Sequence, residues 1–275
     1  MLTDLHVHLR PDDPQATADR YFTQANAERY AEVAAERGID VLGVSEHVHR
    51  FRQALEVWRH PFWERNAVDD LDDYCAFVRE QTSLSLGIEA DFVAGREDRI
   101  GNLLEGRDFD YVLGSVHFLR ELAVDMEGEY DIWRSEDPEQ VWRRYFQTLG
   151  EAARSGLFDV LSHPDLIKVW GENRPHPGGD LRRFYDLAMD GIADSDVAIE
   201  VSTAGLRKPA AEIYPAPALL DMCLEAGRPV ALSSDAHEPD QLGYEYERAV
   251  DWLGSMGVTE IAVFDRRGRR LEPLG

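Results

Sequence analysis

The sequence predicts an α/β fold, and a (β/α) barrel is the first choice. Short apolar runs alternate with longer amphipathic stretches about seven times along the 275 residues, a pattern typical of parallel sheets covered by helices. This length suits one barrel domain, and no change in composition marks a boundary, so we expect a single domain over residues 1–275. A doubly wound open sheet is the main alternative, but no Gly-x-Gly-x-x-Gly turn follows the first apolar run.

Eight runs rich in branched and aromatic residues are expected to form buried strands. In chain order they cover residues 2–8, 39–47, 84–92, 111–119, 159–163, 197–203, 229–237 and 261–264. Helices are expected at 26–37, 138–155, 217–226 and 242–256, because each stretch is followed by a glycine suited to a helix C-terminus. The helix at 138 has Asp137 as its N-cap and a proline in its first turn. The long insertion 51–73 either forms a lid or packs over the barrel.

The charge balance excludes several classes of partner. The chain has 53 acidic and 29 basic residues, a net charge of −24, so its surface should repel nucleic acids and anionic membranes. No apolar run approaches the ~18 residues of a membrane span, and no leader precedes the first motif. The two cysteines, Cys75 and Cys223, are far apart and are expected to be reduced. We therefore expect a cytoplasmic protein with a small-molecule substrate, and the oligomeric state is left open.

Six of the nine histidines fall at or just beyond the ends of expected strands. They are His6, His8, His47, His117, His163 and His237, and they are accompanied by Asp4, Glu46, Glu89, Asp165 and Asp235. In a (β/α) barrel the carboxyl ends of the strands meet on one face, so these groups should converge there. Residues two apart on a strand point to the same side, as in the His6/His8 and Asp235/His237 pairs.

Nitrogen and oxygen ligands without thiolates suit Zn, Mn or Fe. The candidates are too many for one ion, so two or three divalent metal ions are expected. Metals in such an open site activate water and neutralise phosphoryl or acyl oxygens. The other histidines, His49, His60 and His176, are interpreted as ordinary loop residues.

These motifs, taken together, resemble the PHP (polymerase and histidinol phosphatase) family of metal-dependent phosphoesterases. The segments that carry the resemblance occur in the family's order and span most of the chain: DLHVH at 4–8, SEH at 45–47, GIE at 87–89, GSVH at 114–117, SHPD at 162–165 and SSDAH at 233–237. The histidinol-phosphatase branch is indicated by VHFL at 116–119, DLIK at 165–168, STAGLRKP at 202–209 and EIYP at 212–215.

The resemblance implies a distorted seven-stranded (β/α) barrel with a trinuclear site. His6, His8, Glu89 and Asp235 would hold the first metal. Glu89 would bridge to a second metal, completed by His117 and His163, and His47 and His237 would hold the third. The family often supplies one more histidine after the first pair, but residues 9–14 contain none. Asp12 is the favoured replacement and Asp13 the alternative; without either, the third site would be weaker or the centre dinuclear.

The implied activity is that of a phosphomonoesterase, first of all a histidinol-phosphatase. Such an enzyme hydrolyses L-histidinol phosphate to L-histidinol and phosphate, in histidine biosynthesis, by attack of a metal-bridging hydroxide. Glu89, Asp235 and His237 would be the catalytic residues, with the proton for the leaving group coming from a residue such as Asp12 or His237.

Arg207, Lys208 and Arg50 are the candidates for binding substrate, because a planar guanidinium can grip two phosphate oxygens and an ammonium offers a compact charge. A nucleotide, oligonucleotide or sugar phosphate is the alternative substrate. A degenerate binding or regulatory module is a third possibility, but it predicts lost ligands, and the motif residues are all present.

Overall fold

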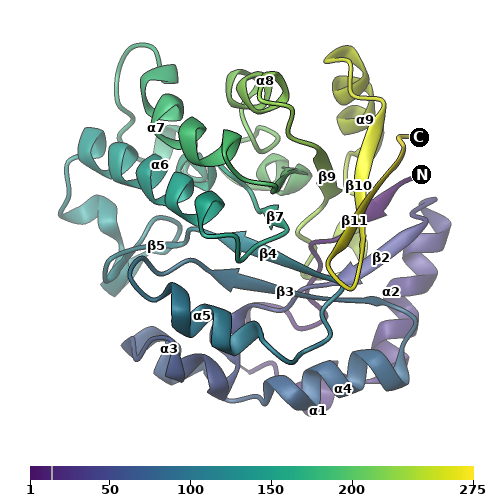
Figure 1. Ribbon diagram of the computed structural model, residues 1–275. Coiled ribbons are helices and arrows are strands. Elements are labelled where there is room, and N and C mark those ends of the chain that lie inside the picture. Colours follow the sequence, from purple (N-terminus) through teal and green to yellow (C-terminus); the bar gives the residue numbers. More distant parts are fainter. Residues whose placement is uncertain (14) are drawn as a thin grey trace.

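Seven parallel strands form the centre of the computed structural model, which describes residues 1–13 and 15–275 (Figure 1). Their order in the sheet is β1-β2-β3-β4-β7-β8-β9, the order of the chain, and every neighbouring pair is parallel. The strands are β1 (Thr3–Asp4), β2 (Val41–Val44), β3 (Ser85–Asp91), β4 (Tyr111–Ser115), β7 (Val160–Leu161), β8 (Ala198–Ser202) and β9 (Val230–Ser233). Each of these seven apolar runs thus contains a strand shorter than predicted, and β3 fills most of its run.

The first and last strands meet just beyond their carboxyl ends. Val7 and Ala236 form a parallel bridge there. The His8 N–H donates to the Ala236 carbonyl at 2.8 Å, and the Ala236 N–H donates to the His6 carbonyl at 3.2 Å. The sheet is therefore nearly closed, which confirms the distorted seven-stranded (β/α) barrel and makes the open doubly wound alternative wrong.

Helices cover the outside of the barrel (Figure 1). They are α1 (Ala18–Tyr21), α2 (Gln24–Glu36), α3 (Pro61–Asn66), α4 (Leu71–Gln81), α5 (Glu97–Leu104), α6 (Pro138–Arg154), α7 (Arg182–Ala193), α8 (Pro217–Glu225) and α9 (Tyr246–Ser255). The predicted cap of α6 is present, since the Asp137 carboxylate accepts a hydrogen bond from the Gln140 N–H at 3.2 Å. None of the helices in the described residues is long and apolar enough to cross a membrane.

Helix α9 begins four residues later than predicted. Glu245 has a left-handed backbone, with a φ of 54°, which interrupts a helix at that point. The Gly243 N–H donates instead to the Asp4 carboxylate at 3.1 Å. A long-range hydrogen bond therefore replaces the first helical turn that the local pattern predicted.

The run 261–264 does not join the barrel, so its assignment as a buried parallel strand is wrong. It belongs to β10 (Glu260–Asp265), which pairs antiparallel with β11 (Gly268–Pro273). Ala262 and Phe264 from this hairpin pack inside one apolar cluster with inward-facing strand residues. Those residues are Leu5, Tyr111, Leu113, Val160, Ala198 and Ala231. The run 261–264 is apolar because Ala262 and Phe264 pack against the interior of the barrel, and not because the run is a strand of the sheet.

A second hairpin follows β4. The predicted strand 111–119 ends at Ser115, and the chain then forms β5 (Phe118–Leu119) and β6 (Leu122–Ala123) as an antiparallel pair. Arg120 in the connecting turn has a φ of 59°, the left-handed value such tight turns require.

The interior of the barrel changes from apolar to polar along the strands. The Tyr111 ring fills the space beside β2 and β3, and a Cβ built on Gly43 or Gly87 would lie 2.3 or 2.4 Å from its atoms. Beyond this ring the buried inward groups are polar: Ser45, Glu89, Ser115, Ser162, Glu200 and Ser233. The barrel therefore presents a buried polar layer at the carboxyl ends of its strands.

The insertion 51–73 packs over this end of the barrel. Phe51, Trp58 and Trp63 are buried in the main hydrophobic core. Phe62 and Arg65, on α3 of the same insertion, line a cavity beside the polar layer. Packing is therefore the arrangement observed, and lid motion stays a prediction.

Candidate metal centre

Glu89 lies at the centre of the polar layer and is 1% exposed. Strand β3 places it there with alternating residues facing inward. Its Oε1 lies 3.1 Å from His163 Nε2 and 3.4 Å from His117 Nε2. Its Oε2 lies 3.4 Å from His6 Nε2 and 3.7 Å from His8 Nε2. The two oxygens of one carboxylate thus face two separate sets of imidazoles.

Asp235 completes the set around His6 and His8. Its Oδ1 lies 3.7 Å from His6 Nε2 and 3.5 Å from His8 Nε2. The Asp235 backbone is left-handed, with a φ of 51°. Arg207 supports this turn, because its Nη2 donates to the carbonyls of Ser234 and Asp235, each at 2.9 Å.

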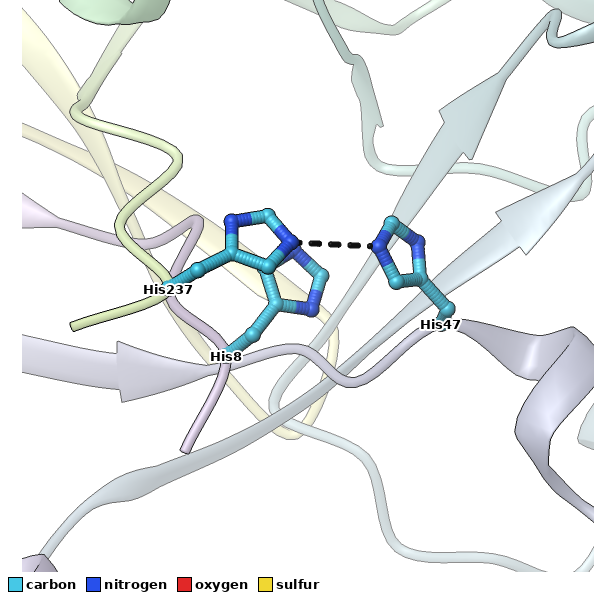
Figure 2. Close-up of side chains that lie close together, drawn as sticks. All are labelled: His8, His47 and His237. Carbon is cyan, nitrogen blue, oxygen red and sulfur yellow. Dashed lines mark hydrogen bonds between the residues drawn. The ribbon is translucent and has the colours of Figure 1, made fainter. Parts of the chain in front are cut away.

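His8, His47 and His237 form a further cluster, and Figure 2 shows their imidazoles close together. The Nε2 atoms of His47 and His237 are 3.3 Å apart. The His8 ring stacks against both rings, with centroid distances of 4.1 and 4.2 Å. His47 also contacts the Glu89 carboxylate through Nδ1.

Asp12 lies beside this cluster. One of its oxygens is 3.1 Å from His237 Nε2 and the other is 3.7 Å from His47 Nε2. Asp13 instead accepts a hydrogen bond from the Gln15 N–H at 2.8 Å. Of the two acids considered for the missing histidine, Asp12 is the one that contacts this pair, and its role as a ligand stays a prediction.

The unpaired atoms in this layer test whether the residues fit a divalent metal. Within the described part of the chain, His6 Nε2, both ring nitrogens of His8 and Glu89 Oε2 are buried without a hydrogen-bond partner. Leaving such groups unsatisfied is costly, and proteins rarely do so. Their donor atoms also fall within 4.8 Å of one another in three groups of His and carboxylate residues. Divalent metal ions would satisfy these nitrogen and oxygen donors, so the residues fit such ions.

The electrostatics of the layer favour deprotonated ligands at two key positions. Burial lowers the pKa of His8 well below its usual value, and the neighbouring His47 and His237 lower it further. Burial acts to raise the pKa of Glu89, but His47 and His6 outweigh it and hold that pKa well below its usual range. Neutral imidazole and ionised carboxylate are the forms that bind metals.

Two buried acids that the sequence reasoning missed hold the imidazoles in place. Glu200 Oε1 accepts from the Ser233 hydroxyl at 2.6 Å and from His6 Nδ1 at 2.8 Å. Its Oε2 accepts from the His163 backbone N–H at 2.5 Å. Because a carboxylate only accepts, His6 donates through Nδ1, and its Nε2 is the ring nitrogen that faces Glu89.

Asp91 does the same for His117, whose Nδ1 lies 2.7 Å from Asp91 Oδ1. Burial lowers the pKa of His117, but Asp91 and Glu89 outweigh it and raise that pKa to about 10. A signal for both acids was present in the sequence, since Asp91 and Glu200 interrupt otherwise apolar expected strands.

The cationic residues predicted to bind substrate occupy different positions. Arg50 is 3% exposed, forms an ion pair with Glu46, and lies 2.6 Å from Asp12. Lys208 is exposed and lines the cavity beside the cluster. Arg207 is committed through Nη2 to two backbone carbonyls, while its Nη1 is buried without a partner among the described residues. Contact of these three residues with substrate stays a prediction.

The cavity that reaches this centre has a volume of about 620 Å³. His47, His117 and Asp12 line it on the side of the centre, and Phe62, Phe118, Met126 and Asp125 are among its other lining residues. His49 also lines it and stacks on His47, with ring centroids 4.9 Å apart. His49 is therefore part of the cavity wall, which its interpretation as an ordinary loop residue did not anticipate.

Comparisons with known proteins agree with this arrangement. A family model described as "PHP domain" matches residues 21–204. A protein of Deinococcus radiodurans named "Probable histidinol-phosphatase" is 34% identical over 252 residues, covering 89% of this chain and 91% of that protein. The Bacillus subtilis protein named "Histidinol-phosphatase" is 24% identical over 265 residues, covering 89% of this chain and 96% of that protein.

A solved structure shares the fold. It is histidinol phosphate phosphatase from Lactococcus lactis, complexed with zinc, L-histidinol and phosphate. The TM-score is 0.68 at 16% sequence identity, and the match covers 98% of this chain and all of that one.

Proposed function

The chain belongs to the PHP domain family, and from that membership we propose that it is a metal-dependent phosphomonoesterase that hydrolyses L-histidinol phosphate to L-histidinol and phosphate. The relatives that match over nearly their full length carry the histidinol-phosphatase name, which supports this substrate. The observation that carries the proposal is Glu89, a buried carboxylate whose two oxygens face imidazoles from five separate histidines.

Two or three divalent ions, of Zn, Mn or Fe, are proposed as the cofactors. The residues that would hold them are His6, His8, Asp12, His47, Glu89, His117, His163, Asp235 and His237. When bound, such ions lower the pKa of water and offset the negative charge of phosphoryl oxygens. Glu89 and Asp235 would serve catalysis through this role, since each contributes a carboxylate oxygen beside the imidazoles of His6 and His8.

The protein groups around this set orient its members. Glu200 and Asp91 fix the tautomers of His6 and His117, so that Nε2 of each ring faces Glu89. Arg50 pairs with both Asp12 and Glu46, offsets part of their negative charge, and limits the freedom of the Asp12 carboxylate. Preorganised donors of this kind need no rearrangement during the reaction.

The L-histidinol alkoxide needs a proton as it leaves. Of Asp12 and His237, which lie 3.1 Å apart, the one that does not bind a metal is proposed to donate that proton. Asp12 also lines the cavity, where the substrate would enter. Lys208 is proposed to contact the phosphate there as a compact positive charge.

Phosphate release from L-histidinol phosphate tests the proposal. Protein loaded separately with Zn, Mn or Fe is assayed against L-histidinol phosphate, a nucleoside monophosphate and a sugar phosphate. We expect the largest kcat/KM for L-histidinol phosphate. Rapid hydrolysis of another ester, with no phosphate released from L-histidinol phosphate, would show that the proposed substrate is wrong.

A further inference from the structure

We infer that Asp125 is a specificity-determining residue, which binds the ammonium group of the substrate through its half-buried carboxylate. The inference rests on the proposed function, and it assigns a residue to the cationic end of that substrate. Asp125 lies on the chain just after β6, in the wall of the cavity that reaches the metal centre. The groups that could hold a metal ion, among the residues described, do not include it.

One oxygen of the Asp125 carboxylate has no hydrogen-bond partner among the described residues. Its Oδ1 is buried and accepts no hydrogen bond from any residue the structure describes. An acceptor of this kind costs free energy unless something else pairs with it. A bound ammonium group would supply both the positive charge and the N–H donors.

The backbone that carries Asp125 is firmly held. The Val124 N–H donates to the His117 carbonyl at 2.9 Å, so Asp125 is fixed relative to a residue of the metal centre. The Val124 carbonyl accepts from the indole N–H groups of Trp133 and Trp170, each at 2.8 Å. A rigid backbone suits a group that must discriminate between ligands, because the group loses little conformational entropy when the ligand binds.

The other charges of the cavity leave Asp125 available for a cation. Arg10 is paired with Asp69, Arg50 with Glu46 and Asp12, and Arg65 with Glu129. No ion pair of Asp125 with Lys208 is present among the described residues, although both line the cavity. The cavity therefore offers an anion and a cation at different positions of its wall, as a ligand with a phosphate and an ammonium group requires.

Apolar groups beside Asp125 fit the rest of such a ligand. Phe118 and Met126 line the same cavity, and Phe62 packs near Phe118 with ring centroids 5.9 Å apart. Aromatic rings stack readily on an imidazole. The arrangement favours a small phosphorylated amine with a flat ring over a sugar phosphate, which has no cation for Asp125 to bind.

The test compares two substrates that differ in the ammonium group alone. These are L-histidinol phosphate and 3-(imidazol-4-yl)propyl phosphate, assayed with the metal-loaded wild-type protein and with Asp125→Asn. We expect Asp125→Asn to raise the KM for L-histidinol phosphate about 10- to 100-fold, the effect of losing a hydrogen bond to a charged group. The KM for the analogue without the amine should stay within about twofold.

Control variants separate recognition from a general disturbance. Glu121→Gln removes a charge from the exposed turn of the same hairpin, where the Glu121 side chain is 71% exposed, and should leave both KM values unchanged. Asp125→Glu retains the charge and should recover part of the affinity for L-histidinol phosphate. Metal content and thermal midpoint are measured for each variant, and we expect Asp125→Asn to match the wild type in both.

The outcomes distinguish this inference from the proposed function. Wild-type protein that does not hydrolyse L-histidinol phosphate contradicts the proposed function itself. Wild-type activity combined with an unchanged ratio of the two KM values in Asp125→Asn overturns only the role of Asp125. An equal loss of kcat on both substrates also overturns it, because that result would assign Asp125 to the chemical step.

Discussion

Single residues in this centre are held by partners whose removal should be measurable. Glu200 accepts three hydrogen bonds, from His6, Ser233 and the His163 backbone. Glu200→Gln replaces one accepting oxygen with a donor, so at least one of these bonds must be lost. We expect metal affinity to fall about 10- to 100-fold, the usual effect of removing such a supporting group.

Titration with zinc and a competing chelator measures that affinity. Glu225→Gln is the matched control, because Glu225 is exposed at the end of α8. Equal zinc affinity in Glu200→Gln and the wild type would contradict the orienting role of Glu200.

Asp235 is the second residue for which the structure makes a sharp prediction. Asp235→Asn removes an ionised oxygen that lies within 3.7 Å of both His6 and His8. Turnover should fall by several orders of magnitude, while the far-ultraviolet circular dichroism spectrum stays that of the wild type. Turnover close to the wild-type value would remove Asp235 from the proposed ligand set.

How far the residues of the centre were predictable depends on where they stand in the sequence. The six motif histidines and Asp235 stand at or just beyond strand ends, and Glu89 lies within its strand, all in recognisable order, so their convergence could be predicted. Glu200 and Asp91 could not be assigned, because an acid inside an apolar run does not reveal which imidazole it will face. The replacement for the missing histidine could be narrowed to Asp12 or Asp13. Only the folded structure shows that Asp12 is the one that lies beside His47 and His237.

At the scale of the elements, close packing between β4 and its neighbours explains why positions 43 and 87 are glycine. The Tyr111 ring lies where a side chain on Gly43 or Gly87 would be. We expect Gly43→Ala and Gly87→Ala each to lower the free energy of unfolding by about 1–3 kcal/mol, the usual cost of overpacking. Urea unfolding measures this change.

Gly254→Ala is the control for these substitutions. A Cβ on Gly254 in α9 meets no atom within 4 Å, so alanine should be neutral or stabilising by up to about 1 kcal/mol. Equal effects at Gly43, Gly87 and Gly254 would contradict the packing explanation.

Local signals predicted some elements well and others poorly, for identifiable reasons. Helix α6 begins and ends within one residue of its prediction, because Asp137 and Gly156 are local signals. Helix α9 and the hairpin of β10 and β11 depend on contacts with Asp4 and with the barrel interior, which no local pattern records. Apolar periodicity reports that a segment is buried, and it does not report which surface buries it.

At the scale of the whole molecule, the buried centre should couple metal binding to stability. In the part of the chain described, His6 Nε2, both ring nitrogens of His8 and Glu89 Oε2 are buried without hydrogen-bond partners, so metal ions that bind them only in the folded state should stabilise it. Removal of metal by dialysis against a chelator should lower the thermal midpoint by several degrees. Return of Zn or Mn should restore the midpoint, whereas an unchanged midpoint in protein proven free of metal would contradict the coupling.

The net charge of −24 also has a meaning at this scale. Only a few of the 53 acidic residues lie in the centre, so the charge is mainly a property of the outer surface. An anionic exterior around a metal site disfavours long polyanions and is compatible with a small substrate that carries its own positive charge. The proposed substrate has this character.

The central claim is that this centre hydrolyses a small phosphorylated amine with the help of bound metal. The most direct test is kcat/KM for L-histidinol phosphate, a nucleoside monophosphate, a sugar phosphate and a short oligonucleotide, with metal content measured in the same sample. We predict the highest kcat/KM for L-histidinol phosphate, in protein that holds two or three metal ions per chain. Fewer than one metal ion per chain after metal-replete expression, or no hydrolysis of L-histidinol phosphate by fully loaded protein, would contradict the claim.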